Sequence, residues 1–195
     1  MESWGKIAQK IRVPAGTVLG IVFLFLMHPS RRSLWIGGVV AALGAMIRVW
    51  AAGHIDKGQV LARGGPYART RNPLYLGSFL MALGVLLAGQ GYWLLVPFFA
   101  FFVGTYYPVM KAEEAELLQG HGPVFVEYER RVPMFFPAFG RAVSEPLDVA
   151  RQPLSLKGRY ASEPSRFLWS RVVRNREHRT LAGLVAVFLL LRFRA

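Results

Sequence analysis

Long apolar segments separated by short polar ones dominate this sequence. The longest runs from Asn72 to Met110 and holds 39 consecutive residues without a charged side chain. A transmembrane helix needs about 20 apolar residues to cross a hydrocarbon core of about 30 Å, so this run is long enough for two crossings. Gly89-Gln90-Gly91, near its middle, supplies a turn. The pattern therefore predicts a helical hairpin made of Leu74–Ala88 and Tyr92–Met110.

Two further apolar segments precede this hairpin, and a third lies near the end of the chain. Val13–Ser30 is uncharged over 18 residues, and Leu34–Gly53 is apolar except for Arg48. Thr180–Leu191 has only 12 uncharged residues, a length that suits an interfacial helix as well as a tilted span. We therefore expect an all-α integral membrane protein with four transmembrane helices, or five if Thr180–Leu191 also crosses.

The distribution of basic residues predicts an orientation. The chain has 24 Lys and Arg against 11 Asp and Glu, a net charge of +13. With alternating helices, 19 basic residues share one side with the N-terminus, and only Arg31 and Arg32 lie opposite. A fifth span would add Arg192 and Arg194 to the sparse side. The positive-inside rule makes the crowded side cytoplasmic, and we expect the inner membrane of a prokaryote.

Composition restricts the partners and the chemistry. The absence of cysteine excludes disulfides, thiolate metal sites and a cysteine nucleophile. The four histidines are scattered along the sequence, so we expect no metal centre. Topology and attraction to the anionic lipids of the cytoplasmic leaflet account for the positive charge, and no RNA-binding pattern accompanies it. Nucleic acid is therefore not an expected partner.

The polar stretch Leu61–Gly77 carries the first candidate site. It combines glycines and two tyrosines with Arg71, which directly precedes Asn72 and Pro73. Proline is well suited to the first position of a helix, and a helix start beside an arginine favours an anionic group such as a carboxylate. The alternative is an ordinary interfacial segment, with arginine for lipid phosphate and tyrosine in the aromatic belt.

Two more features follow the hairpin. Glu113 and Glu114 lie just beyond the uncharged run on the expected extension of its second helix, where adjacent side chains point about 100° apart. Either these carboxylates pair with a cationic group of the protein or of a ligand, or they form a solvated helix end. The segment from Phe125 to Pro137 combines aromatic residues, arginines and prolines, which indicates either a helix returning to the membrane or an amphipathic surface helix.

The order and spacing of the three features resemble one enzyme superfamily. Gly-Pro-Tyr at 65–67, Asn-Pro-Leu-Tyr-x-Gly at 72–77, an apolar hairpin, Glu-Glu-x-x-Leu at 113–117 and Val-Pro-x-Phe-x-Pro at 132–137 occur in that order. Together they are similar to the isoprenylcysteine carboxyl methyltransferase and phospholipid methyltransferase superfamily. The resemblance implies a membrane enzyme that uses S-adenosylmethionine without a Rossmann-type fold. It also implies a membrane methyltransferase domain over 1–137, with its catalytic half at about 48–137. The polar and basic composition after Pro137 predicts a basic cytoplasmic extension over 138–195, with a possible fifth transmembrane or interfacial helix.

The resemblance implies a role for particular residues. It assigns catalysis to Arg71 and Glu114, which would hold the charged groups of the cofactor, and to Arg131, which would hold an acceptor carboxylate. It assigns cofactor binding to Gln59, Leu61, Gly65, Tyr67, Arg71, Asn72, Pro73, Leu74, Tyr75, Glu113 and Glu114. This sequence departs from the family pattern at several positions, among them Asn72 in place of the usual histidine and Met134 in place of a frequent arginine.

These inferences predict methyl transfer from S-adenosylmethionine to a lipophilic acceptor that enters from the bilayer. An isoprenylcysteine-type carboxylate would need no general base, whereas a lipid amine would have to lose a proton, for which His54 or a glutamate is a candidate. Two alternatives are an NADPH-dependent membrane reductase of the sterol reductase type and a non-catalytic scaffold or lipid-binding protein. The sequence leaves the acceptor and the oligomeric state open.

Overall fold

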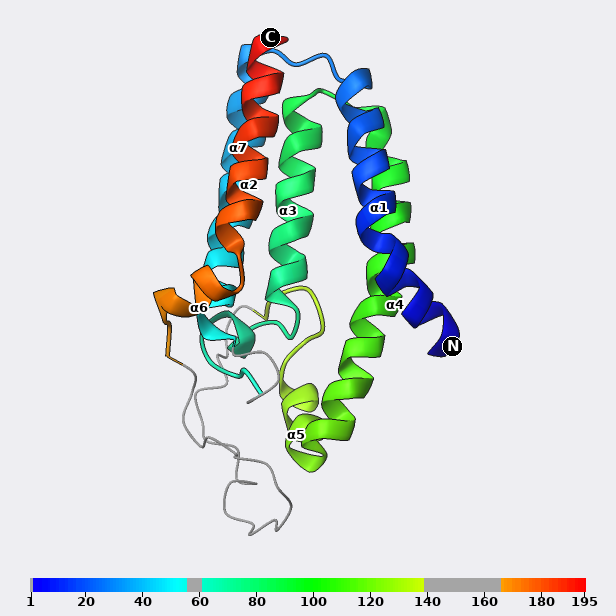
Figure 1. The fold of residues 1–195 in the computed structure, drawn as a ribbon, viewed down its shortest axis with the longest axis vertical. Helices are drawn as coiled ribbons and strands as arrows, with labels where there is room; N and C mark the ends of the chain where they lie inside the picture. Colours follow the sequence, from blue (N-terminus) through cyan, green and yellow to red (C-terminus); the bar gives the residue numbers. More distant parts are fainter. Residues whose placement is uncertain (1, 56–60, 139–165) are drawn as a thin grey trace. The chain divides into compact units, whose positions relative to one another are not determined.

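The computed structural model describes residues 2–55, 61–138 and 166–195, with side chains at Lys10 and from Pro14 onward. These residues form helices and connecting turns, with no strand among them. In chain order the elements are α1 (Glu2–Leu26), α2 (Arg31–His54), η1 (Gly65–Ala68), α3 (Pro73–Ala88), η2 (Tyr92–Leu94), α4 (Leu95–His121), α5 (Pro123–Arg131), α6 (Trp169–Arg174) and α7 (Glu177–Phe193), as Figure 1 shows.

The chain divides into two compact units. Unit 1 comprises Met1–Met46, Gly77–Glu113 and Arg179–Ala195, and unit 2 comprises Ile47–Leu76 and Glu114–His178. The predicted domains, 1–137 and 138–195, stay a prediction. The predicted extension contributes α6 to unit 2 and most of α7 to unit 1.

Unit 1 is built around a close contact between α2 and α3. A Cβ atom added to Gly37 would overlap backbone atoms of Gly84 and Ala88, and one added to Gly44 would overlap the backbone of Gly77. Small residues at such spacing let two helix backbones approach closely, a packing mode common in membranes. In unit 1, α2 also lies beside α7, where Gly38 faces Phe188 (Figure 1).

Hydrogen bonds hold the turns at one end of unit 1. Ser30 begins α2 as a capping residue, because its side chain accepts a bond from the Ser33 backbone N–H at 3.2 Å. The Ser33 hydroxyl donates to the Ala88 carbonyl at 2.7 Å, and the His28 N–H donates to the Gly89 carbonyl at 2.9 Å. The turn predicted at residues 89–91 therefore lies against the turn that precedes α2.

The lengths of the helices agree in part with the predicted spans. Two segments of the described chain, Arg31–His54 and Tyr92–His121, are long and apolar enough to cross a membrane. Pro14–Leu26 and Pro73–Ala88 are shorter apolar helices. The helix predicted around Thr180–Leu191 forms as α7, with 17 residues. Four or five crossings remain a prediction.

Candidate functional site at the start of α3

In unit 2, the loop that leads into α3 is held by the segment that follows α5. The Arg71 backbone N–H donates to the Pro133 carbonyl at 2.9 Å, and the Thr70 hydroxyl donates to the Phe135 carbonyl at 2.8 Å. The Asn72 side-chain amide donates to the Met134 carbonyl at 3.1 Å. These bonds join chain segments about 60 residues apart and fix the residues that immediately precede Pro73.

The Arg71 side chain forms an ion-pair cluster with two carboxylates. Its Nη1 lies 3.2 Å from Glu114 Oε1 and 2.6 Å from Glu129 Oε1. The side chains of Arg71 and Glu114 are only 9% and 8% exposed, whereas that of Glu129 is 40% exposed. Arg71 and Glu114 thus form a buried pair, and Glu129 closes it from the solvent side.

The cluster retains capacity to bind a charged ligand. Arg71 Nε is buried and makes no hydrogen bond with the part of unit 2 that the structure describes. One guanidinium faces two carboxylates, so these three side chains carry a formal charge of −1. A buried guanidinium with an unused donor suits an anionic group, and the excess of carboxylate suits a cationic one.

The buried side chain of Tyr128 stabilises the loop that precedes α3. The Tyr128 hydroxyl donates to the Tyr67 carbonyl at 2.7 Å, and its ring packs with Leu61, Phe125 and Val132 in an apolar cluster. Burial raises the pKa of the Tyr128 hydroxyl well above its usual range, a shift that the nearby Arg71 guanidinium partly opposes. Tyr128 therefore acts as a neutral donor in this position.

His54, at the end of α2, lies against the glycine-rich turn. Its Nδ1 is 2.8 Å from the Trp50 carbonyl oxygen, which can only accept, so Nδ1 carries a proton and Nε2 of the neutral ring has a lone pair. Gly65 has a φ of +59°, and a Cβ there would overlap the His54 ring. The position thus requires glycine both for its backbone conformation and for this close approach.

A second buried ion pair in unit 2 was not anticipated from the sequence. Arg48 donates to Glu177 through Nε at 2.9 Å and through Nη2 at 2.7 Å, and the Glu177 side chain is only 5% exposed. Arg48 Nη1 also lies 3.4 Å from the carbonyl oxygen of Leu74, in the first turn of α3. The end of α2, the start of α7 and the start of α3 are thus linked by one arginine.

Of the predicted site residues, the structure brings Arg71 and Glu114 into direct contact. Pro73 is fully buried, and Leu74 packs with Tyr67 in an apolar cluster. Tyr67 and Leu61 also have buried side chains, and Tyr75 is half-buried.

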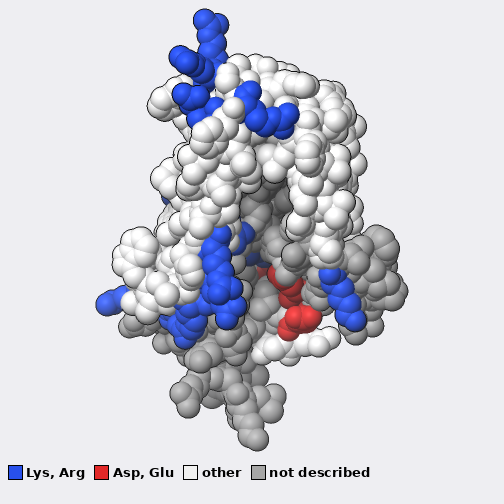
Figure 2. All heavy atoms as spheres, turned by 45° about the horizontal axis from the view of Figure 1, so that its top comes forward, with Lys and Arg blue, Asp and Glu red and all other residues white. Residues whose placement is uncertain are grey.

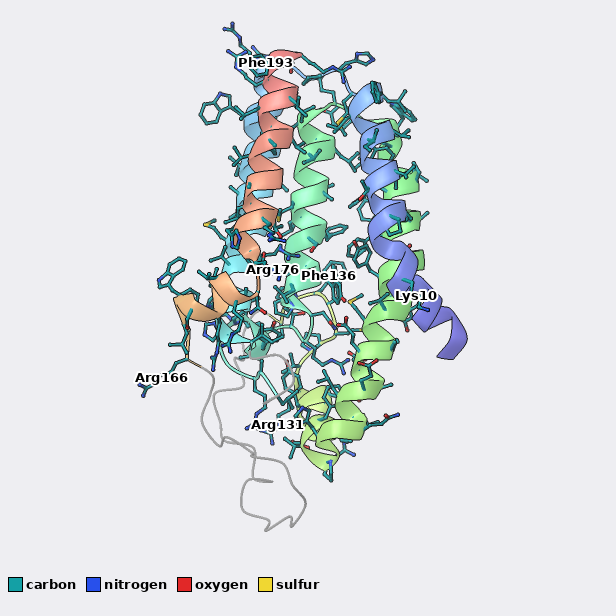
Figure 3. The ribbon with its side chains drawn as sticks, viewed as in Figure 1. Lys10, Arg131, Phe136, Arg166, Arg176 and Phe193 are labelled. Atoms are coloured by element: carbon teal, nitrogen blue, oxygen red, sulfur yellow. The ribbon has the colours of Figure 1, made fainter. Side chains whose placement is uncertain are left out.

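Three other predicted residues are placed elsewhere or fall outside the description. Arg131 is exposed on α5, labelled in Figure 3, and its Nε donates to Glu127 at 2.6 Å. Glu113 belongs to unit 1, and Gln59 lies outside the described residues. Glu129 was not predicted from the sequence, where its only signal is its place one residue beyond Tyr128 on a short amphipathic helix.

Comparison with known proteins confirms the resemblance seen in the sequence. Residues 36–121 match the sequence model of a family described as phospholipid methyltransferase, part of the superfamily that also contains the isoprenylcysteine carboxyl methyltransferases. This segment includes the glycine-rich turn, the start of α3 and Glu114. The match is thus to a family of phospholipid methyltransferases, and the two long apolar helices agree with a membrane protein.

Two curated bacterial proteins are similar to the chain. One is the nickel-cobalt-cadmium resistance protein NccN of Alcaligenes xylosoxydans, 29% identical over 66% of this chain and 65% of its own length. The other is the cobalt-zinc-cadmium resistance protein CzcN of Cupriavidus metallidurans, 32% identical over 53% of this chain and 49% of its own length. The chain thus spans about half to two thirds of the relatives that it matches. No solved structure matches it.

Proposed function

We propose that this chain is a membrane methyltransferase that uses S-adenosylmethionine and acts on a lipophilic acceptor reaching it from the bilayer. The buried pair of Arg71 and Glu114, within the segment that matches the phospholipid methyltransferase family, carries the proposal. In the proposed topology the helices cross the membrane four or five times, with the N-terminus and this site on the cytoplasmic side of a prokaryotic inner membrane.

The charged groups of the cofactor fit the residues at the start of α3. The amino-acid end of S-adenosylmethionine has both a carboxylate and an ammonium group. Arg71, with its unused buried Nε donor and the N-terminus of α3 beside it, suits the carboxylate. Glu114 suits the ammonium or the sulfonium, because a buried carboxylate is stabilised by a neighbouring positive charge.

Positioning is the main task of the protein in such a reaction. The bound cofactor supplies a methyl group activated by a sulfonium, which an in-line displacement transfers to the acceptor. This chemistry depends on alignment more than on covalent catalysis. The hydrogen bonds from residues 70–72 to the backbone carbonyls of residues 133–135, together with the buried Tyr128, hold the Arg71 loop in one arrangement. The same contacts would keep the cofactor at a fixed angle.

The two classes of acceptor would draw on different residues. A carboxylate acceptor needs a cation and no base, the role that the resemblance gives to Arg131. Because Arg131 is exposed and paired with Glu127, such an acceptor would have to displace that contact. An amine acceptor needs a base, and the lone pair that the Trp50 contact leaves on His54 Nε2 meets this need.

Calorimetric titration of S-adenosylmethionine into the detergent-purified chain tests the proposal. We expect saturable binding that Arg71→Lys weakens about ten- to hundredfold, because lysine keeps the charge but loses the planar fork. Arg130→Lys, an exposed position on α5, serves as the matched control and should bind like wild type. Equal affinity of the folded Arg71→Lys variant would remove Arg71 from the site.

The same preparation distinguishes the alternatives. Binding of NADPH in place of S-adenosylmethionine would favour a reductase, and binding of neither would favour a scaffold or lipid-binding protein. Incubation of labelled S-adenosylmethionine with a lipid extract, followed by mass identification of the labelled product, would then name the acceptor.

A further inference from the structure

An apolar groove runs between α2 and α7 in unit 1. It has a volume of about 270 Å³, and its described lining contains only apolar side chains and glycine. Gly38, Ala41 and Ala42 form the α2 side, and larger side chains such as Val185, Phe188 and Leu189 form the other. Because the small residues of α2 leave room that α7 does not fill, the groove has the shape and polarity to receive one hydrocarbon chain.

Basic side chains gather at one end of this groove. A Cβ at Gly38 would lie 3.7 Å from Phe188, which sets the register of the two antiparallel helices. At about 1.5 Å of rise per residue, Arg194 then lies level with Arg32, and Arg192 lies level with Leu34, which belongs to the same first turn of α2 as Arg31. All four arginines are exposed. The upper end of Figure 1 comes forward in Figure 2, where a group of blue basic side chains lies at that end.

The positive charge at this end is not balanced within the described part of unit 1. Glu113 is its only acidic residue with a described side chain, and it lies near the opposite end of the unit's portion of α4. Arg194 has a structural role, because it donates to the carbonyls of Leu24 and Phe25 at the end of α1. Arg31, Arg32 and Arg192 are exposed with no ion pair among the described residues.

Exposed aromatic residues mark the membrane surface at the same level. Trp35 lies one turn from Arg31, and Phe193 adjoins Arg192, and both side chains are largely exposed. Trp93, also exposed, follows the turn at 89–91 that is bonded to His28. Tryptophan and other aromatic residues concentrate at the level of lipid headgroups, so the arginines lie where lipid phosphates would be.

We propose that an anionic phospholipid binds along α2 and α7, with one acyl chain in the groove and its phosphate between Arg31, Arg32 and Arg192. This site uses none of the residues assigned to methyl transfer. In the proposed orientation it faces away from the cytoplasm, where the positive-inside rule disfavours basic residues. A bound anionic headgroup gives these arginines a partner on that side.

Thermal unfolding and native mass spectrometry of the detergent-purified chain, with added lipid, test this site. The probes are phosphatidylglycerol and phosphatidylcholine with identical acyl chains, and inorganic phosphate as the free anion. We expect phosphatidylglycerol to bind at least tenfold more tightly than phosphatidylcholine and to raise the unfolding temperature, because several arginines near one anionic headgroup each contribute. Inorganic phosphate should neither bind tightly nor raise the unfolding temperature, because it has no acyl chain to place in the groove.

Three variants test whether the preference for phosphatidylglycerol arises at the proposed site. Arg31→Gln/Arg32→Gln/Arg192→Gln should reduce the preference for phosphatidylglycerol to within about twofold, whereas Arg130→Gln/Arg166→Gln/Arg179→Gln removes the same charge from exposed positions and should retain it. Ala42→Leu, which fills the groove, should weaken both lipids. Equal binding of the two lipids to wild type, an equal loss in both triple variants, or a stabilisation by inorganic phosphate that matches that by lipid would overturn the proposal.

Discussion

Arg48 on α2 forms a two-point ion pair with Glu177 at the start of α7, although 129 positions separate them. Both side chains are largely removed from solvent, and Arg48 also reaches the Leu74 carbonyl in the first turn of α3. Leu168 and Asn175 also donate to the carbonyls of Gly53 and Ala52, so the segment before α7 is bonded to the end of α2 at two places in addition to the ion pair.

Removal of one partner of this pair should destabilise the protein strongly. Glu177→Gln leaves a guanidinium without its carboxylate, and we expect a loss of about 3 kcal/mol, measured by denaturant or thermal unfolding in detergent. The double variant Arg48→Met/Glu177→Leu should recover most of that loss, because it buries no unpaired charge. Glu127→Gln, which breaks the exposed pair with Arg131, is the matched control and should change stability by less than about 1 kcal/mol. Similar losses in the two single variants would contradict this assignment.

The contact between α2 and α3 should tolerate no added methyl group. A Cβ at Gly84 would overlap backbone atoms of Gly37 and Ala41, so Gly84→Ala must push the two helices apart, at a cost of about 1–3 kcal/mol. Gly104→Ala, in a helical position with nothing within 4 Å of the new atom, should be neutral or stabilising by up to about 1 kcal/mol. Unfolding temperatures of the two variants in the same detergent provide the comparison, and equal values would show that the helices are not held this closely.

The two carboxylates that pair with Arg71 should differ in their effect on cofactor affinity. Glu114→Gln should weaken S-adenosylmethionine binding about tenfold, because it removes a buried charge-assisted partner. Glu129→Gln should not weaken it, since the half-exposed Glu129 competes with the cofactor carboxylate for Arg71. Titration calorimetry of both variants, with the exposed Glu116→Gln as control, measures the difference. If Glu129→Gln were the more damaging change, the proposed roles would be reversed.

Stability should fall at alkaline pH because of Tyr128. Its pKa in the folded protein is raised by burial above the ordinary value of about 10, so from that pH upward the unfolded chain loses this proton while the folded one keeps it. The contribution of the Tyr128 hydroxyl to the free energy of unfolding is complete below pH 10. It declines by up to about 1.4 kcal/mol per pH unit as the pH rises toward the raised pKa.

Tyr128→Phe isolates this contribution. It keeps the ring against Leu61 and Phe125 but removes the titrating hydroxyl and its bond to Tyr67, so it should be less stable than wild type at neutral pH and lose stability less steeply above pH 10. Unfolding temperatures measured from pH 8 to 11 give both slopes. Parallel curves for the two proteins would assign the alkaline loss to other groups.

The sequence predicted the helices well, because long uncharged runs leave the backbone few options other than hydrogen bonding within a helix. Their ends were less predictable. The first helix begins at Glu2 rather than Val13, since a charged face does not prevent a helix from continuing out of an apolar segment. The small-residue contact between Gly37, Gly44 and Gly84 was visible as a spacing but required knowledge of which helices are neighbours.

The residues of the candidate site were predictable where they lie within one local motif. Ion pairs between distant parts of the chain were not. Arg71 stood out because it precedes Pro73, and Glu114 because it follows a long uncharged run. The sequence could not show that Arg48 meets Glu177, because an ion pair between distant segments leaves no local pattern. The sequence also could not show that Arg131 forms an ion pair with Glu127, four residues away, since a charged helix face is compatible with many partners.

The bonds that hold the loop before α3 have a consequence for sequence variation. The hydrogen bonds from Thr70 and Asn72 to Met134 and Phe135 are accepted by backbone carbonyls, and so is the bond from the Arg71 N–H to Pro133. A carbonyl group is present whatever side chain the residue carries. Methionine at 134, where the family pattern named in the sequence analysis often has arginine, therefore leaves these hydrogen bonds intact, and a change of side chain at this position should not release the loop.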